Sequence, residues 1–150
     1  MPTAGDIITV PTVPGSRIAT QIETSDSASF TSTRVAVSSV TAALVAGRIY
    51  RVRAHTRFKS SNAGDNVLSQ IRENDSNGAV LTADERKVSD TQNGTTIGTV
   101  FNFEAEYTAS STGEKTFSLT GARTSGSGNC SMEADAVRPT YFYVDYIRDA

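Results

Sequence analysis

The segment Arg48–Phe58, with the sequence RIYRVRAHTRF, alternates between two kinds of side chain. One set is largely apolar and comprises Tyr50, Val52, Ala54, Thr56 and Phe58. The other set is polar and comprises Arg51, Arg53, His55 and Arg57. Because successive side chains of a strand point to opposite faces, this pattern predicts a β-strand with one buried face and one face in water.

Similar segments recur along the 150 residues, separated by turns rich in Gly, Ser, Asn and Asp. The clearest are residues 67–73, 99–107, 115–123 and 141–148. About eight strands at this close spacing predict an all-β protein, an antiparallel two-sheet β-sandwich of the jelly-roll type. Residues 29–40 are also expected to form strand, 42–47 a short apolar turn, and 90–95 a loop.

Residues 1–17 differ in composition from the rest of the chain. They contain three of the four prolines, which disfavour a regular central strand. They also contain the apolar side chains Ile7, Ile8, Val10 and Val13. We therefore predict an extended N-terminal docking arm over 1–17, followed by one β-sandwich domain over 18–150. The alternative is a strand-like segment that lies along its own domain.

The overall charge excludes a strong general attraction to polyanions. Lys and Arg (14) nearly balance Asp and Glu (16), and the net charge is -2. We expect neither nucleic acid nor a membrane as partner, since no apolar run approaches the roughly 20 residues that span a bilayer. No secretory signal is visible, so we expect synthesis in a cytoplasm.

The residues needed for catalysis or metal binding are scarce. His55 is the only histidine and is expected on a solvated strand face, while Cys130, the only cysteine, is expected in the core. One His and one Cys cannot form a zinc site of the usual kind. Asp75–Asn77 resembles the start of a calcium loop but lacks the later bidentate Glu. The sequence therefore predicts no enzyme, no metal site and no cofactor.

Charged and aromatic rows predict a subunit interface instead. Glu104 and Glu106 are spaced to share one strand face, and basic and acidic rows on adjacent strands can pair across a sheet. Such rows are either solvated or covered by a partner subunit. The last strand is apolar on both faces, which favours an exposed aromatic strip at an interface. The alternative is a central strand that is covered on both faces within the monomer. The candidate interface residues are Arg51, Arg53, Arg57, Tyr141, Tyr143 and Tyr146.

Four segments together resemble small virion proteins of tailed bacteriophages. They are AGRIYRVRAHTRFKSS (46–61), QIREND (70–75), FEAEYTASSTGEKTFSLTGARTSGSGN (103–129) and PTYFYVDYIRD (139–149). The resemblance covers about residues 30 to 148 as a pattern, and no single short motif in it is diagnostic. It implies a β-sandwich subunit on the outside of the particle, of the head decoration, head fibre or minor tail type, with no catalytic residues to carry over.

Because the chain has no shaft, we expect a capsid decoration protein on the outer surface of the head. Its arm would dock on the major capsid protein, and the protein would be a homo-oligomer, with a trimer the natural expectation at three-fold positions. The alternative is a tail-associated module that binds host-surface glycans. Its contacts would come from the polar loops at 62–66, 90–95 and 124–129.

Overall fold

The computed structural model of the chain describes residues 13–88, 90–92 and 95–150. All regular elements in these ranges are β-strands. They are β1 (Arg17–Glu23), β2 (Val35–Leu44), β3 (Arg48–Ser60), β4 (Asp65–Glu73), β5 (Val80–Val88), β6 (Asp90–Gln92), β7 (Thr95–Ile97), β8 (Thr99–Thr108), β9 (Gly113–Ser125), β10 (Cys130–Glu133) and β11 (Thr140–Asp149). Among the described residues no helix could cross a membrane.

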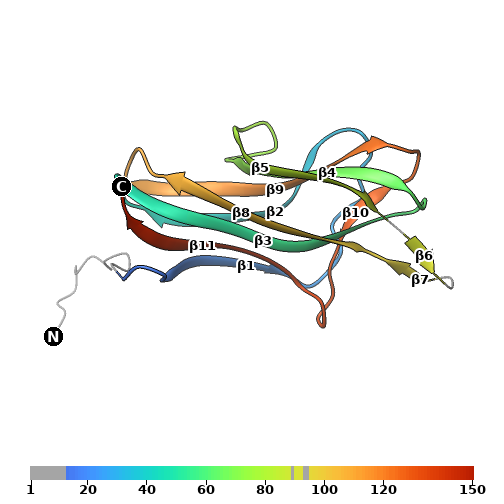
Figure 1. Cartoon of the computed structure of the whole chain (residues 1–150), viewed down its shortest axis with the longest axis horizontal. Coiled ribbons are helices and arrows are strands. Elements are labelled where there is room, and N and C mark those ends of the chain that lie inside the picture. Colours follow the sequence, from blue (N-terminus) through green and yellow to red (C-terminus); the bar gives the residue numbers. More distant parts are fainter. Residues whose placement is uncertain (1–12, 89, 93–94) are drawn as a thin grey trace.

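Nine of these strands form two antiparallel sheets packed face to face (Figure 1). In the first sheet β11 lies between β1 and β3, and β8 pairs with the other edge of β3. The short β10 extends this sheet beside the end of β3. The second sheet has the order β2-β9-β4-β5. Successive long strands pass from one sheet to the other except at the β4–β5 hairpin, which confirms the predicted jelly-roll sandwich.

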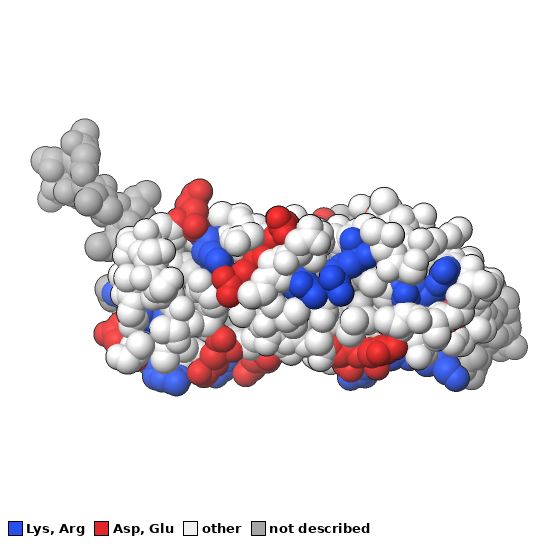
Figure 2. All heavy atoms as spheres, turned by 90° about the horizontal axis from the view of Figure 1, so that it is seen from above, with Lys and Arg blue, Asp and Glu red and all other residues white. Residues whose placement is uncertain are grey.

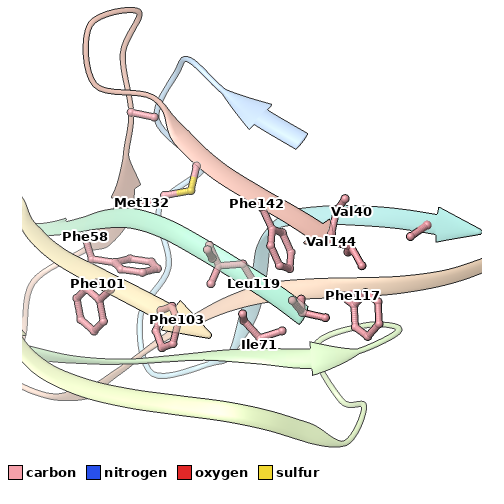
Figure 3. Packing of buried hydrophobic residues seen from close by; sticks show 14 of the residues in the cluster. Val40, Phe58, Ile71, Phe101, Phe103, Phe117, Leu119, Met132, Phe142 and Val144 are labelled. Carbon is pink, nitrogen blue, oxygen red and sulfur yellow. The ribbon is translucent and has the colours of Figure 1, made fainter. Parts of the chain in front are cut away.

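The core fills the space between the sheets with side chains from both (Figure 3). Phe58 of β3 packs edge-on against Phe101 of β8, with ring centroids 5.1 Å apart. Leu119 and Phe117 of β9 enter the core from the second sheet and are fully buried, with Phe117 at the other end of the core, beside Tyr107. The inward set of β3 is buried as the sequence predicts, because the period of two places every second residue on the core side.

Three segments differ from their predicted structure. Residues 42–44 continue β2 instead of starting a turn, because they pair in register with Gly113–Lys115 of β9. Conversely, the expected strand 29–40 begins only at Val35, and Phe30 forms a single bridge to Cys130. Within 90–95, predicted to be a loop, parts of the β6–β7 hairpin form a third, two-stranded sheet.

The described chain begins at one end of the sandwich, beside its C terminus (Figure 1). Gly15 N donates to Tyr146 O at 2.7 Å, and Tyr146 N donates to Ser16 O at 2.9 Å. Arg17, expected to end the arm, is instead the first residue of β1 and pairs with Asp145. The chain is therefore attached to the edge of the first sheet from residue 15 onward.

Charges of both signs are mixed on the surface. On the side shown in Figure 2, basic and acidic side chains alternate, and neither sign covers the face. Strand β5 lies at the edge of its sheet, and Val80 is a large exposed apolar side chain on it.

Candidate functional site

The outer face, as we call it, is the side of the sheet β1-β11-β3-β8 that points away from the core. Strand alternation and register place polar and aromatic side chains on it from all four strands. They are Arg17, Thr20, Ile22, Arg51, Arg53, His55, Arg57, Asn102, Glu104, Glu106, Tyr141, Tyr143 and Asp145. The outer face therefore contains five of the six residues predicted to form a subunit interface.

A buried carboxylate organises the centre of the outer face. Asp145 is 6% exposed and accepts hydrogen bonds from Arg17 Nε at 3.0 Å and Arg53 Nη2 at 2.6 Å. The bond to Asp145 raises the pKa of Arg53 above its ordinary value. Both guanidinium groups also lie against the ring of Tyr143, with Cζ atoms 3.7 and 4.9 Å from its centroid. Cation–π contact and ion pairing thus hold the two arginines in one place.

One ion pair joins the basic row of β3 to the acidic row of β8, and the other charges of the two rows are paired differently. Arg51 Nε lies 3.2 Å from Glu104 Oε1, and Glu106 contacts Arg148 of β11 at 3.3 Å. Arg57 has no ion-pair partner among the residues that the structure describes. Because these pairs are partly exposed, each contributes only about 0–1 kcal/mol to stability. Their main effect is to make most of the outer face nearly neutral.

The outer face is hollowed over its centre. The hollow has a volume of about 560 Å³ and is lined by Arg17, Arg53, Ala54, His55, Asn102, Phe103, Glu104, Tyr141 and Tyr143. His55 Nδ1 donates to Asn102 Oδ1 at 2.6 Å, which leaves Nε2 as the free ring nitrogen. Tyr141 is 40% exposed, and Ile22, its partner in the strand register, is 48% exposed. The hollow therefore combines an open aromatic ring with polar groups on fixed strands.

Tyr146 does not belong with the other predicted interface residues. Its side chain is 3% exposed and packs beside Tyr50 in the core, with ring centroids 5.9 Å apart. Its odd separation from Tyr143 places it on the inner side of β11. Of the predicted arm residues, Ile7, Ile8 and Val10 lie outside the described residues. Val13 is described and is 65% exposed.

Two of the loops predicted to contact glycans bind each other. Asn62 Nδ2 donates to Ser127 Oγ at 2.8 Å, and Ser61 N donates to Asn129 O at 2.9 Å. Asp65 accepts from the backbone of both Ser127 and Gly128. Much of the polar capacity of 62–66 and 124–129 is therefore used in holding this end of the sandwich together. The third loop, 90–95, lies partly outside the described residues.

The described side chains form no cluster of His, Cys, Asp and Glu suited to a metal ion. Cys130 is fully buried, and burial raises the pKa of its thiol. Asp75 Oδ1 accepts from Asn77 N at 2.7 Å within an exposed turn. His55 is held by the Asn102 amide, and no carboxylate among the described residues bonds to its ring.

Sequence reasoning missed Arg17 and Asn102 as parts of this site. Arg17 was grouped with the arm, and nothing in its neighbourhood indicates that it meets Asp145, 128 residues later. Asn102 could have been found, because it shares the outward set of its strand with Glu104. Its contact with His55 depends on the β3–β8 pairing, which the alternation of side chains does not specify.

No protein-family model matches the sequence, and no curated protein matches it. Solved structures with similar folds include dimeric latent PorU from Porphyromonas gingivalis, at 9% identity and a TM-score of 0.48 over 97% of this chain. The protein of T=1 particles derived from infectious bursal virus has 14% sequence identity and a TM-score of 0.47 over 100% of this chain. The CBM22-1 xylan-binding domain of Paenibacillus barcinonensis Xyn10C has 8% sequence identity and a TM-score of 0.35 over 74% of this chain.

The chain spans 14%, 41% and 65% of these three proteins, respectively. All three TM-scores are below 0.5, so these likenesses carry no argument about what the chain binds or where it acts. A functional conclusion has to come from the residues of this chain.

Proposed function

We propose that the protein is a structural component of a bacteriophage virion, a capsid decoration protein that binds the outer surface of the assembled head and stabilises it. The observation that carries this proposal is the junction between the apolar N-terminal segment and the sandwich. Gly15 and Ser16 fix the chain to β11, and Val13 is already exposed. In this proposal the segment before Gly15 is the attachment, and the buried core of the described residues, from Phe30 to Tyr146, belongs to the body.

The body itself suits a structural role. Its core is closed between two sheets, and the charges of the outer face are largely paired within the chain. The resemblance to small virion proteins of tailed phages is the reason why we propose the phage particle as the place where the protein acts. Major capsid protein is then the partner of the arm, and copies of this chain are neighbours on the lattice. We propose no catalytic activity.

Co-sedimentation with capsids assembled without this protein tests the proposal. The full chain is expected to sediment with the capsids, and a chain lacking residues 2–12 is expected to stay in the supernatant. This deletion keeps the hydrogen bonds of Gly15 and Ser16, so the body should remain folded. Equal binding by both chains would show that the segment is not the attachment.

Point variants refine the same test. A triple variant with Ser in place of Ile7, Ile8 and Val10 should not bind capsids, because it lacks the apolar surface that would contact the capsid. Replacing Thr3, Thr9 and Thr12 with Ser alters the same segment at three positions with little loss of apolar surface, and should leave binding intact. If neither the full chain nor any variant binds capsids, the decoration proposal is wrong.

A second function, a tail-associated module that binds host-surface glycans, is favoured by one observation. The hollow of the outer face presents the open ring of Tyr141 beside fixed polar groups. This is the usual composition of a small-ligand site, an apolar surface with a few placed polar groups. Under this second proposal, the candidate glycan contacts lie on the sheet and not in the loops.

A further inference from the structure

The hollow on the outer face contains hydrogen-bond donors that the protein does not use. Arg17 directs Nε and Arg53 directs Nη2 to Asp145, and their other N–H groups donate to no acceptor among the described residues. The side chains of Arg17 and Arg53 are 49% and 33% exposed, so a ligand oxygen can approach their guanidinium groups from the hollow. A charge-assisted hydrogen bond to such a donor is stronger than one between neutral groups.

The arrangement of these donors favours a carboxylate. Two guanidinium groups converge on one carboxylate already, and both remain fixed by the ring of Tyr143. Guanidinium binds carboxylate through paired, charge-assisted hydrogen bonds. A second carboxylate that approaches the same pair therefore meets donors that are already oriented, and ordering them costs little.

The charge of the hollow limits how anionic the ligand can be. Arg17, Arg53 and Glu104 are the charged side chains that line the hollow, and their ion-pair partners Asp145 and Arg51 lie beside it. Together these five groups leave one excess positive charge, which a ligand with one carboxylate per binding unit matches. A polyanion with closely spaced charges, such as nucleic acid, would meet the carboxylate of Glu104 on the wall and that of Asp145 beside it, and would be repelled.

The remaining surface of the hollow suits a sugar ring. Tyr141 exposes 40% of its surface on the wall of the hollow, and its ring offers an apolar face with a polar hydroxyl. One face of a pyranose consists largely of C–H groups and packs on such a ring. His55 Nε2 adds a polar group for a sugar hydroxyl, since Nδ1 is already bonded to Asn102.

We propose that this hollow binds a pyranose that carries a carboxylate, as in an acidic polysaccharide built of uronic acids. The carboxylate lies against Arg17 and Arg53, and the sugar ring packs on Tyr141. The inference rests on the second function proposed above and names its ligand class. It does not depend on attachment to the head.

Isothermal titration of the full chain with oligogalacturonate, oligoglucuronate and the methyl ester of oligogalacturonate tests the assignment. The ester keeps the sugar and removes only the charge. At least one acidic oligosaccharide should bind, and the ester should bind at least tenfold more weakly than its parent acid. Absence of binding to both acids overturns the proposal. Equal binding of acid and ester overturns the carboxylate assignment.

Three variants separate the roles of the side chains. Arg53→Gln should weaken binding of the acid at least tenfold and leave the weak binding of the ester unchanged. Tyr141→Ala should weaken both ligands by a similar factor. Arg72→Gln on β4 of the other sheet is the control and should bind like the parent chain, since Arg72 bonds Gln70 and Gly78 and does not line the hollow. Parental affinity in Arg53→Gln would contradict the proposal.

Sedimentation of the same samples without ligand tests whether a second copy of this chain, and not a sugar, occupies the hollow. If the chain self-associates through this face, Tyr141→Ala should dissociate the assembly, and the sugar assignment would then be wrong. Because these assays contain no capsids, their failure leaves the decoration proposal standing. Failure of capsid binding likewise leaves the sugar assignment standing.

Discussion

Replacing Asp65 should reveal how one buried carboxylate holds two loops together. Asp65 is 3% exposed and accepts from Ser60 Oγ at 2.7 Å, Gly128 N at 2.8 Å and Ser127 N at 3.2 Å. Asp65→Asn can keep the two bonds to Oδ2, but its amide would then face the N–H of Ser127. We expect the free energy of unfolding to fall by about 1–3 kcal/mol. Asp65→Ala removes all three acceptor contacts and should lower it by about 2–5 kcal/mol.

The pH dependence of this loss has a definite sign. The hydrogen bond from Ser60 is the main reason why the pKa of Asp65 lies below its ordinary value of 3.8, and the backbone N–H groups add to it. A carboxylate whose pKa is lower in the folded state than in the unfolded state stabilises the folded state, and this stabilisation is complete at pH values above its unfolded pKa. That stabilisation disappears as the pH falls from 3.8 through the folded pKa. The difference between parent and Asp65→Asn should therefore shrink below pH 3.8.

Urea unfolding followed by far-ultraviolet circular dichroism, at neutral pH and in steps toward about pH 3, measures both effects. Asp75→Asn is a matched control, because Asp75 also accepts from a backbone N–H but in an exposed turn. It should change the unfolding free energy by less than about 0.5 kcal/mol. If Asp65→Asn is as stable as the parent at neutral pH, or if the difference grows on acidification, the reasoning is refuted.

Three further predictions concern the core. Phe58→Ala should lower the unfolding free energy by about 3–5 kcal/mol in the same urea assay, since Phe58 is fully buried; a loss under about 1 kcal/mol would contradict its place in the core. Gly121→Ala should cost about 1–3 kcal/mol, because the added Cβ would lie 2.5 Å from the ring of Phe30; unchanged stability would show that this contact yields freely. The Cys130 thiol should react with a thiol reagent only on unfolding, since burial covers it and raises its pKa, and rapid labelling of the native chain would refute this.

Local patterns predicted the fold where strands have one wet and one buried face. Alternation identified β3 and β8 because each is flanked by core on one side only. It failed at residues 42–44, where small apolar side chains in Ala42–Leu44 gave no clear choice between turn and strand. There the register with β9, set by residues about 70 positions away, decides the structure.

The outer face was predictable in part for the same reason. Arg51 and Arg53 share a face by spacing, and so do Glu104 and Glu106, so the ion pair of Arg51 with Glu104 could be expected. The pairs of Arg53 and Glu106 with residues of β11 could not. The hollow could not be expected, because it needs Arg17 from β1 next to Asp145 from β11. Strand order is a property of the whole chain, and the alternation within each strand does not contain it.

Immunogold labelling of intact particles, purified from a lysate in which the protein is made, tests the decoration proposal most directly. The proposal predicts label spread over the surface of the head. Label confined to the tail, or absent from the particles, would contradict it.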